Sequence, residues 1–208
     1  MIKIALIRHG KTYGNTFGRY IGVTDEPLCE EGIRQMSDRV MDTVDLVFVS
    51  PMTRCIQSAE LLYPYARRVQ IPEFRECNFG DFENKNYQEL QSNPEYQKWV
   101  DSMATLAFPN GESPDQFQKR CVKGFDNMVD TCIRRHYKNV ACVVHGGTIM
   151  SIMSTYGIPA RDYFGWQVPN GCGYHICISE RNWKLGLREA FMESEINVEH
   201  VSMTVLLE

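Results

Sequence analysis

Three short apolar runs, rich in β-branched residues, are the most distinct pattern along the chain. They cover residues 2–7, 46–50 and 140–144, and each gives way at once to polar residues, glycine or proline. Runs that are apolar throughout, rather than at alternate positions, are typical of strands buried on both faces of a sheet. We therefore expect three central β-strands, each followed by a loop.

Longer stretches between and after these runs are predicted to be helical. They lie at about residues 30–42, 52–63, 86–102, 114–136 and 147–156. Near the end, residues 173–179 and 184–191 alternate between apolar and polar, which indicates a hairpin at an antiparallel edge of the sheet. Strands that alternate with helices predict an α/β fold, with a mostly parallel sheet covered by helices on both faces. The chain has no internal repeat or hinge-like linker, so we expect residues 1–208 to form one domain.

Residues 72–114 fit this alternation least well, and we call this segment the excursion. It is rich in aromatic residues and contains the turn signal Pro109-Asn110-Gly111. We expect it to form helices and loops above the carboxyl ends of the strands, where ligands of open α/β sheets bind. Its aromatic side chains suit either a flat leaving group or a small core of their own.

Composition and charge narrow the classes of function. The chain has 22 basic and 26 acidic residues, a net charge of −4 and no basic block, which argues against nucleic acid as a partner. No apolar run reaches the length of a membrane span, and the first residues lack the features of a signal peptide. The eight cysteines form no C-x-x-C pair. We therefore expect free thiols, a cytoplasmic location and no membrane association, with a homodimer as one alternative for the oligomeric state.

Each apolar run ends in residues that suit the binding of a phosphate dianion. Arg8 and His9 follow the first run, Arg54 lies just after the second, and His145 follows the third. Because the carboxyl ends of parallel strands share one edge, these side chains can converge there, and Asn15 in the first loop is close enough to join them. Arginine offers a planar set of donors that matches phosphate oxygens, and a protonated histidine adds positive charge. A helix that starts near Gly147 adds backbone N–H groups.

Taken singly, these residues have ordinary explanations. An Arg-His-Gly tripeptide is often a chance loop, His145 alone suits a core histidine, and Arg54 alone suits the surface of a helix. The remaining histidines, His136, His175 and His200, lack a following glycine and are expected to lie outside any site. No group of His, Cys, Asp and Glu shows the spacing of metal ligands, so we expect no metal.

Four blocks of sequence follow one another in a specific order. They are L-I-R-H-G-K-T at residues 6–12, S-P-M-T-R-C-I-Q-S-A at 50–59, F-R-E-C-N-F-G-D-F-E at 74–83 and V-V-H-G-G at 143–147. This order resembles the histidine phosphatase superfamily, in its phosphoglycerate-mutase-like branch. The resemblance implies a three-layer α/β sandwich, an enzyme without metal or other cofactor, and a small phosphorylated metabolite as its partner.

The resemblance also implies roles for individual residues. His9 is the expected nucleophile and Glu76 the expected proton donor. The residues expected to hold the phosphate are Arg8, Asn15, Arg54, His145 and the backbone N–H of Gly146. Ile21 and Gly22 are expected to line the substrate site. Glu83 lies seven residues after Glu76 and is a rival for the role of acid.

Two positions depart from the family pattern. Cys29 stands where Ser or Thr usually caps the following helix, a change that costs about 1 kcal/mol of stability. Asn84 stands where many members have glycine, which leaves the local turn undetermined. Neither position bears on the chemistry.

The function that these features favour is a phosphomonoesterase that takes a phosphoryl group onto His9 and passes it to water. Residues 72–76 and 108–113, with Gly171 and Cys172, resemble α-ribazole phosphatases, so α-ribazole 5′-phosphate is a candidate substrate. The first alternative is phosphoryl transfer of the phosphoglycerate-mutase type. The family's mutases, however, carry a longer insertion between the acid block and the last histidine, including an Arg-Arg pair followed by a proline run, and this chain has no such insertion. The second alternative is a non-catalytic phosphate-binding protein, which would be expected to have lost a reactive residue.

Overall fold

A seven-stranded mixed sheet forms the centre of the computed structural model, which describes residues 1–39 and 41–197. The strand order is β3-β2-β4-β1-β6-β7-β5. The strands are β1 (Ile2–Arg8), β2 (Leu46–Val49), β3 (Arg68–Gln70), β4 (Asn139–Val144), β5 (Gly157–Ile158), β6 (Gly173–Ile178) and β7 (Ala190–Ile196). The first four in this order are mutually parallel, whereas β6 runs antiparallel to β1 and β7. The expected α/β fold with a mostly parallel sheet and an antiparallel edge is confirmed.

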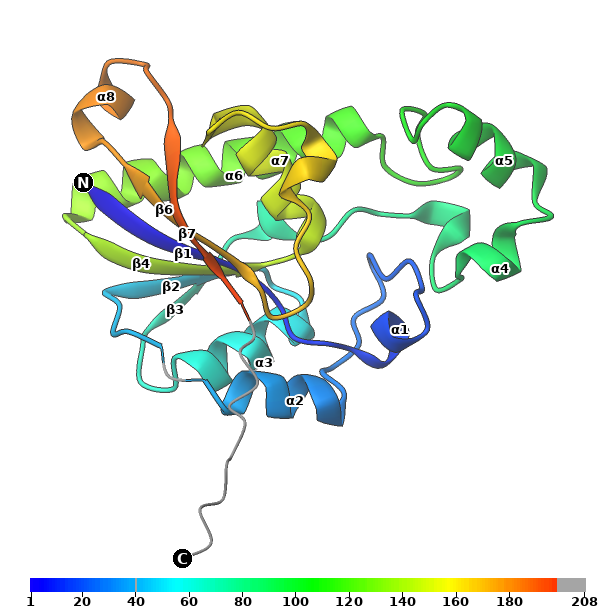
Figure 1. The fold of residues 1–208 in the computed structure, drawn as a ribbon, viewed down its shortest axis with the longest axis horizontal. Helices are drawn as coiled ribbons and strands as arrows, with labels where there is room; N and C mark the ends of the chain where they lie inside the picture. Colours follow the sequence, from blue (N-terminus) through cyan, green and yellow to red (C-terminus); the bar gives the residue numbers. More distant parts are fainter. Residues whose placement is uncertain (40, 198–208) are drawn as a thin grey trace, which may run out of the picture.

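Helices lie on both faces of this sheet (Figure 1). The α-helices are α1 (Tyr13–Thr16), α2 (Glu30–Ser37), α3 (Thr53–Leu62), α4 (Tyr87–Leu90), α5 (Pro94–Asp101), α6 (Pro114–Arg135), α7 (Gly146–Tyr156) and α8 (Glu180–Lys184). Short 3₁₀ helices are η1 (Pro72–Phe74), η2 (Gly80–Phe82) and η3 (Tyr163–Trp166). Helices α6 and α7 cover one face and α2 and α3 the other, which gives the three layers that the resemblance implied.

Alternate side chains of β1 point into two different cores. Ile4 and Leu6 belong to the cluster that includes residues of α6 and α7, whereas Ala5 and Ile7 belong to the cluster that includes residues of α2 and α3. All four side chains are buried. Burial on both faces explains why the sequence of this strand is apolar throughout instead of alternating.

The C-terminal hairpin differs from its prediction. Its second strand was expected at residues 184–191 but lies at Ala190–Ile196, because α8 occupies the connection. The side chain of Ser179 accepts a hydrogen bond from the backbone N–H of Asn182, which caps this short helix. Gly186 follows with a φ of 81°, a left-handed conformation that ends the helix and favours glycine. The short strands β3 and β5 were not predicted, because so few residues carry no clear periodicity.

Two predicted helices also differ. The helix expected at 86–102 is divided into α4 and α5, because Asn93 caps a new helix at Pro94. Proline has no N–H to donate within a helix and is therefore favoured in a first turn. The helix expected at 30–42 ends at Ser37.

The excursion lies beyond the carboxyl ends of the central strands, as expected, with α4 and α5 at its far end (Figure 1). It has a core of its own, formed by Cys77, Phe82, Leu90, Tyr96 and Phe108 together with Phe117 and Cys121 of α6. Several of its rings meet edge to face, including Phe82 with Tyr96 at a centroid distance of 5.3 Å. These aromatic side chains therefore serve mainly to build the excursion.

The two departures from the family pattern are both accommodated locally. Cys29 is the N-cap of α2, and its Sγ accepts a hydrogen bond from the backbone N–H of Gly32 at 3.5 Å. A thiol therefore performs the capping, as a weaker acceptor than a hydroxyl. Asn84 has a φ of 57°, in the left-handed region that asparagine tolerates better than most residues. The turn that glycine would form is thus preserved.

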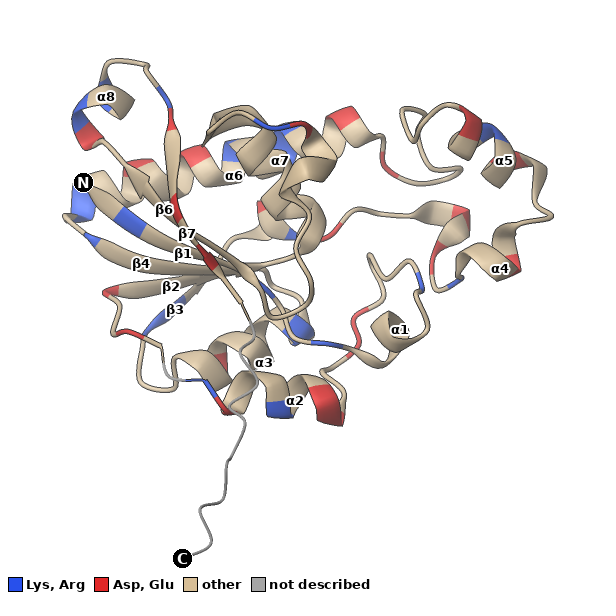
Figure 2. Ribbon diagram, in the orientation of Figure 1, with Lys and Arg blue, Asp and Glu red and all other residues tan. Residues whose placement is uncertain are grey.

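Charged residues are dispersed over the molecule, with basic and acidic positions interleaved on helices, strands and loops (Figure 2). Positive charge at any anion site must therefore come from individual arginines. Within residues 1–39 and 41–197, no helix combines the length and the apolar composition that crossing a bilayer requires. His200 lies outside the described residues.

Candidate active site

The register of the sheet brings two histidines together. Strands β1 and β4 are parallel neighbours in which Arg8 pairs with Val144, so the next residues, His9 and His145, leave the sheet side by side. Their ring centroids are 5.2 Å apart, with the ring planes at 69°. The backbone N–H of His9 donates to the carbonyl of Val144 at 2.9 Å, which extends the pairing beyond the strand. The convergence expected from the sequence is present in the structure.

The imidazole of His9 is held in one tautomer. Its Nδ1 lies 2.7 Å from the carbonyl oxygen of Gly10, which can only accept, so Nδ1 carries the proton and Nε2 keeps its lone pair. Burial lowers the pKa of His9 well below its usual value of 6.5, and the positive charges of Arg54 and Arg8 lower it further. A neutral imidazole with a free Nε2 is the form that can attack phosphorus.

Two arginines lie beside this ring, and Arg8 is only partly buried. Arg54 is fully buried on α3, and its Nη atoms donate to the carbonyls of Ile21, Gly22 and Thr24 at 2.9–3.3 Å. Arg8 donates through Nη1 to the carbonyl of Val168 at 2.8 Å.

The Nε atom of each arginine is buried and has no hydrogen-bond partner among the described residues. Neither side chain takes part in an ion pair within that part of the chain. A largely buried cation that makes no ion-pair contact is costly, so the pair favours an anion. The most suitable anion is one that accepts from several donors at once, as phosphate does.

His145 differs electrostatically from the expectation of a protonated ring. Burial lowers its pKa well below 6.5, and Arg54, His9 and Arg8 lower it further. Its Nε2 lies 2.8 Å from the hydroxyl of Ser50 at the end of β2. Burial first, and the surrounding positive charges second, therefore favour the neutral ring before an anion binds.

Glu76 lies in the loop after η1 and faces the same centre. One carboxylate oxygen, Oε1, accepts from the backbone N–H of Cys77 at 2.9 Å, and the other, Oε2, lies 3.9 Å from Nδ1 of His145. The side chain of Glu76 is only 12% exposed. Burial raises the pKa of Glu76 above its usual value, although the Cys77 N–H and the nearby arginines oppose this shift. A raised pKa suits a carboxyl group that must donate a proton.

The first residues of α7 are two glycines that allow close packing. A Cβ on Gly146 would lie 3.4 Å from Nε of Arg8, so this backbone runs directly beside the guanidinium. A Cβ on Gly147 would lie 2.8 Å from Oε1 of Glu76 and 2.9 Å from the ring of Phe117. The N-terminus of α7, with its free N–H groups, therefore reaches the same centre as the arginines.

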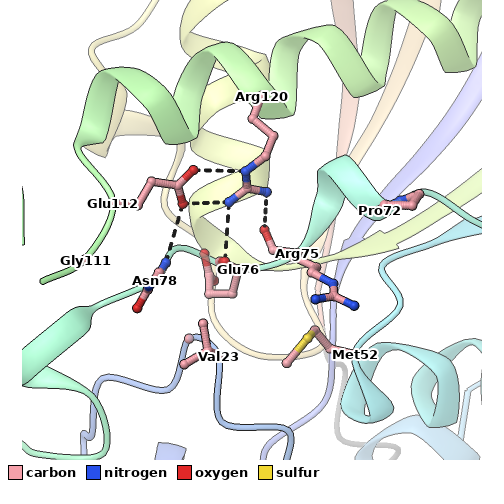
Figure 3. Close-up of a pocket in the computed structure, with 10 residues that line it drawn as sticks. Val23, Met52, Pro72, Arg75, Glu76, Asn78, Gly111, Glu112 and Arg120 are labelled. Carbon is pink, nitrogen blue, oxygen red and sulfur yellow. Dashed lines mark hydrogen bonds and ion pairs between the residues drawn. The ribbon is translucent and has the colours of Figure 1, made fainter.

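The excursion is tied to α6 at the position of Glu76 (Figure 3). Arg120 of α6 forms a two-bond ion pair with Glu112, with N···O distances of 3.0 and 2.7 Å. Its guanidinium also donates to the backbone carbonyls of Glu73 and Arg75, at 2.7 and 2.9 Å. This arginine thus fixes the backbone that carries Glu76.

A cavity of about 410 Å³ opens beside Glu76. Its wall combines apolar residues, such as Val23 and Met52, with polar ones, such as Arg75 and Asn78 (Figure 3). A cavity next to a candidate proton donor is suited to hold the alcohol part of an ester.

Four further residues were expected at or near the site, and each makes a different contact. Asn15 lies in α1, where its Oδ1 accepts from the backbone N–H of Thr12 at 3.2 Å. Gly22 lines the cavity. The side chain of Ile21 is buried, and its carbonyl faces Arg54. Glu83 accepts from the backbone of residues 22 and 24.

Sequence reasoning missed Asn170 and noted Gly171 only for its resemblance to α-ribazole phosphatases, whereas both residues hold the backbone of the nucleophile. The Nδ2 of Asn170 donates to the carbonyl of His9 at 3.2 Å and to Oδ1 of Asn15 at 3.1 Å. The N–H of Gly171, whose φ is 77°, donates to the carbonyls of Arg8 and His9, both at 3.1 Å. Asn-Gly is a turn signal in the sequence, but it did not reveal which distant segment the turn contacts.

No group of three or more His, Cys, Asp or Glu residues in the described ranges has the geometry to hold a metal ion. The anion-binding groups identified above are arginines, histidines and backbone N–H groups.

Comparisons with known proteins agree with this geometry. The family model of the histidine phosphatase superfamily (branch 1) matches residues 4–189. The adenosylcobalamin/alpha-ribazole phosphatase of Escherichia coli (strain K12) is 31% identical over 189 residues, which cover 86% of this chain and 92% of that protein. A probable phosphoglycerate mutase, GpmB of Yersinia pestis (strain Pestoides F), is 29% identical over 173 residues, which cover 77% of this chain and 78% of its own.

A solved structure has the same fold over nearly the whole length. The alpha-ribazole phosphatase from Shigella flexneri superimposes with a TM-score of 0.81 at 26% identity, covering 95% of this chain and 97% of its own. On the family match and these relatives, the chain belongs to branch 1 of the histidine phosphatase superfamily and is a phosphatase.

Proposed function

We propose that this phosphatase hydrolyses a small phosphate monoester through a phosphohistidine on His9. The observation that carries the proposal is the state of the His9 ring: Nδ1 is committed to the Gly10 carbonyl, whereas Nε2 makes no hydrogen bond among the described residues and lies beside Arg54, which is fully buried, and Arg8. A neutral nucleophile surrounded by positive charge can both attract a dianion and attack it. Arg8, Arg54, His145, Asn15 and the N–H of Gly146 form the proposed phosphate site.

In the first step, Nε2 of His9 forms a bond to phosphorus while the ester P–O bond breaks. The departing oxygen takes the proton of Glu76, so the alcohol leaves in its neutral form. The transferring phosphoryl group spreads its charge over three oxygens, and Arg8 and Arg54 stabilise that charge where it develops. Glu76 is left as a carboxylate.

In the second step, the Glu76 carboxylate removes a proton from a water molecule. The water oxygen forms a bond to phosphorus, and the N–P bond to His9 breaks. Inorganic phosphate leaves, while His9 is again neutral and Glu76 again protonated. The two steps together consume one ester and one water, and release one alcohol and one phosphate.

For the leaving alcohol we propose α-ribazole, so that the substrate is α-ribazole 5′-phosphate. The support is the 31% identity to the Escherichia coli enzyme that is named for this activity. The resemblance to a probable phosphoglycerate mutase at 29% identity makes phosphoryl transfer to a second phosphoglycerate the competing function. The chain lacks the longer insertion of the family's mutases, and neither of its Arg-Arg pairs is followed by a proline run, which favours hydrolysis.

The proposed function predicts a specific result in a panel of phosphate esters. We expect release of inorganic phosphate from α-ribazole 5′-phosphate, at a higher kcat/KM than from 3-phosphoglycerate or p-nitrophenyl phosphate, and no hydrolysis of a phosphodiester. Because the site uses arginines where a metallophosphatase uses cations, excess EDTA should leave the rates unchanged. Conversion of 3-phosphoglycerate to 2-phosphoglycerate faster than its hydrolysis would instead support the mutase. Loss of activity in EDTA that Mg²⁺ or Zn²⁺ restores would contradict the site.

The pKa shifts predict the shape of the pH profile for an alkyl phosphate. The reactive form has His9 neutral and Glu76 protonated. Because the pKa of His9 is lowered well below 6.5, its protonation should limit the rate only in acid. Because burial raises the pKa of Glu76, kcat/KM should fall as the pH rises through the pKa of this carboxyl group, which loses its proton there. In Glu76→Gln this alkaline fall should disappear from the profile; if it persists unchanged, another group supplies the proton.

A further inference from the structure

Glu83 takes no part in the proposed chemical steps, yet it is half-buried within the same region of the molecule. Its Oε1 accepts two hydrogen bonds, from the backbone N–H of Gly22 at 2.8 Å and from that of Thr24 at 2.9 Å. Its Oε2 is buried without a partner among the described residues. One carboxylate oxygen therefore joins the excursion to the loop of residues 21–24.

The same loop holds the guanidinium of Arg54. The carbonyl of Thr24 accepts from Nη1 at 2.9 Å, and those of Gly22 and Ile21 accept from Nη2 at 3.1 and 3.3 Å. These bonds use three of the five N–H groups of the guanidinium and leave two spare donors, Nε and the second N–H of Nη1. The position of the loop thus decides the direction of both.

We propose that Glu83 is a positioning residue that fixes the guanidinium of Arg54 through the backbone of residues 21–24. This inference rests on the proposed role of Arg54 in phosphate binding. Glu83 accepts from the N–H groups of this loop, and Arg54 donates to its carbonyls. The loop therefore connects two side chains that are 29 positions apart in the sequence, so that Glu83 can restrain Arg54 without touching it.

The packing around the loop shows why such a restraint is needed. A Cβ on Gly22 would lie 1.9 Å from the carbonyl oxygen of Cys77, so this contact admits only glycine. Glycine gives the backbone great freedom, and Glu83 removes that freedom by binding the N–H groups on both sides of Val23.

Carboxylates hold the neighbouring residues of the loop in the same way. Asp25 accepts from the N–H and the hydroxyl of Thr53, at 2.7 and 2.9 Å, at the first turn of α3. Glu26 accepts from the N–H of Gly14 at 3.0 Å. Three acidic side chains near a dianion site are therefore engaged in backbone and hydroxyl bonds that order the loop around Arg54.

Substitutions at Glu83 separate positioning from acid catalysis. Glu83→Gln keeps one oxygen that can accept both N–H bonds, but it cannot carry a proton. Glu83→Ala removes the oxygen, and Glu83→Asp shortens its reach by one methylene. We expect the order of kcat/KM to be wild type and Gln, then Asp, then Ala. The loss in Ala should be about 10- to 100-fold, as expected when a reacting group is misplaced.

Three measurements identify the mechanism of that loss. The Ki of inorganic phosphate should rise about tenfold in Glu83→Ala, since the displaced group binds phosphate. The loss should be equal for p-nitrophenyl phosphate and an alkyl phosphate, because proton donation is unaffected. In an Arg54→Gln background, Glu83→Ala should cost less than about twofold, because coupled residues are not additive.

Asp45 offers a matched control at the amino-terminal ends of β2 and β4, the opposite end of these strands from the site. The Oδ2 of Asp45 also accepts from two backbone N–H groups, those of Lys138 and Asn139, at 2.7 and 3.0 Å. Asp45→Ala should lower the Tm without changing kcat/KM or the phosphate Ki. Glu83→Ala should change both kinetic constants even when its Tm matches that of Asp45→Ala.

The results that would overturn the inference are distinct from those that would overturn the proposed function. Additive losses in the Glu83 and Arg54 double variant, or a Glu83→Gln variant as impaired as Glu83→Ala, would show that Glu83 does not act through Arg54. Should Glu83→Ala not fold, Glu83→Asp gives the same comparison. A wild-type chain that hydrolyses no phosphomonoester would instead contradict the function itself.

Discussion

His9→Ala is expected to abolish turnover almost completely. The variant lacks the ring nitrogen that would form the bond to phosphorus, and Nε2 of the neighbouring His145 is engaged with the hydroxyl of Ser50 at 2.8 Å. Losing a covalent nucleophile costs roughly 10⁴-fold or more in kcat. The same change should eliminate the intermediate: denaturation of the wild-type enzyme during turnover, without acid, should trap acid-labile phosphate on His9, and the variant should trap none.

His175→Ala is the control for this experiment. His175 lies on β6, paired with Ala5 well inside the sheet, and should be dispensable for the chemistry. Peptide mapping of the trapped enzyme identifies the residue that carries the phosphate. Phosphate on His145 instead of His9 would reverse the assignment of the two histidines. Phosphate on neither, with full activity in His9→Ala, would rule out the covalent mechanism.

Glu76→Gln is expected to have an effect that depends on the leaving group. An alkoxide is a poor leaving group and needs the proton of Glu76, whereas p-nitrophenolate departs largely without it. General acid catalysis contributes about 10²- to 10⁴-fold, so phosphorylation of His9 by an alkyl phosphate should slow by that factor. Phosphorylation by p-nitrophenyl phosphate should slow much less. Burst-phase kinetics measure this first step directly.

Steady-state rates test whether Glu76 also acts as the base in the second step. Water attack on phosphohistidine needs Glu76 as a base, so the steady-state rate should fall for both substrates in Glu76→Gln. Glu83→Gln is the matched control, with the same chemical change seven residues away. If Glu83→Gln shows the leaving-group dependence and Glu76→Gln does not, Glu83 is the acid and both the proposed mechanism and the positioning role of Glu83 are wrong.

The sequence by itself determined the centre of the fold. The runs at 2–7, 46–50 and 140–144 correspond to β1, β2 and β4, because strands buried on both faces require continuous apolar residues. The positions of His9 and His145 followed from the same pattern, since residues that end neighbouring parallel strands emerge at one edge. Local signals of this kind need no knowledge of distant contacts.

The edges of the sheet could not be predicted as well, for the opposite reason. Strands β3 and β5 are too short to show a periodicity, and β7 begins later than predicted because α8 lies before it. The N-cap at Asn93 divided a predicted helix in two. At these positions a single capping residue or turn decides where a helix or strand ends, and the average helix or strand propensity of the segment does not show it.

The surroundings of individual side chains could be seen only in the tertiary structure. The sequence could present Glu76 and Glu83 only as two carboxylates seven residues apart. Folding buries Glu76 beside His145 and thereby raises the pKa of its carboxyl group. The carboxylate of Glu83 instead accepts hydrogen bonds from the backbone N–H groups of Gly22 and Thr24. A pKa and a hydrogen-bond partner depend on which distant groups surround a side chain, so neither can be read from its neighbours in the chain.

The same reason explains the two remaining differences. A protonated His145 was expected from its residue type, but Arg54, His9 and Arg8 converge on it from other segments, so burial and positive charge keep it neutral. Asn170 contacts His9 across 161 positions of sequence. The sequence therefore determined which residue types reach the site and the strands that carry them there. Their pKa shifts and their hydrogen-bond partners could be seen only in the tertiary structure, because those properties arise from contacts that only folding creates.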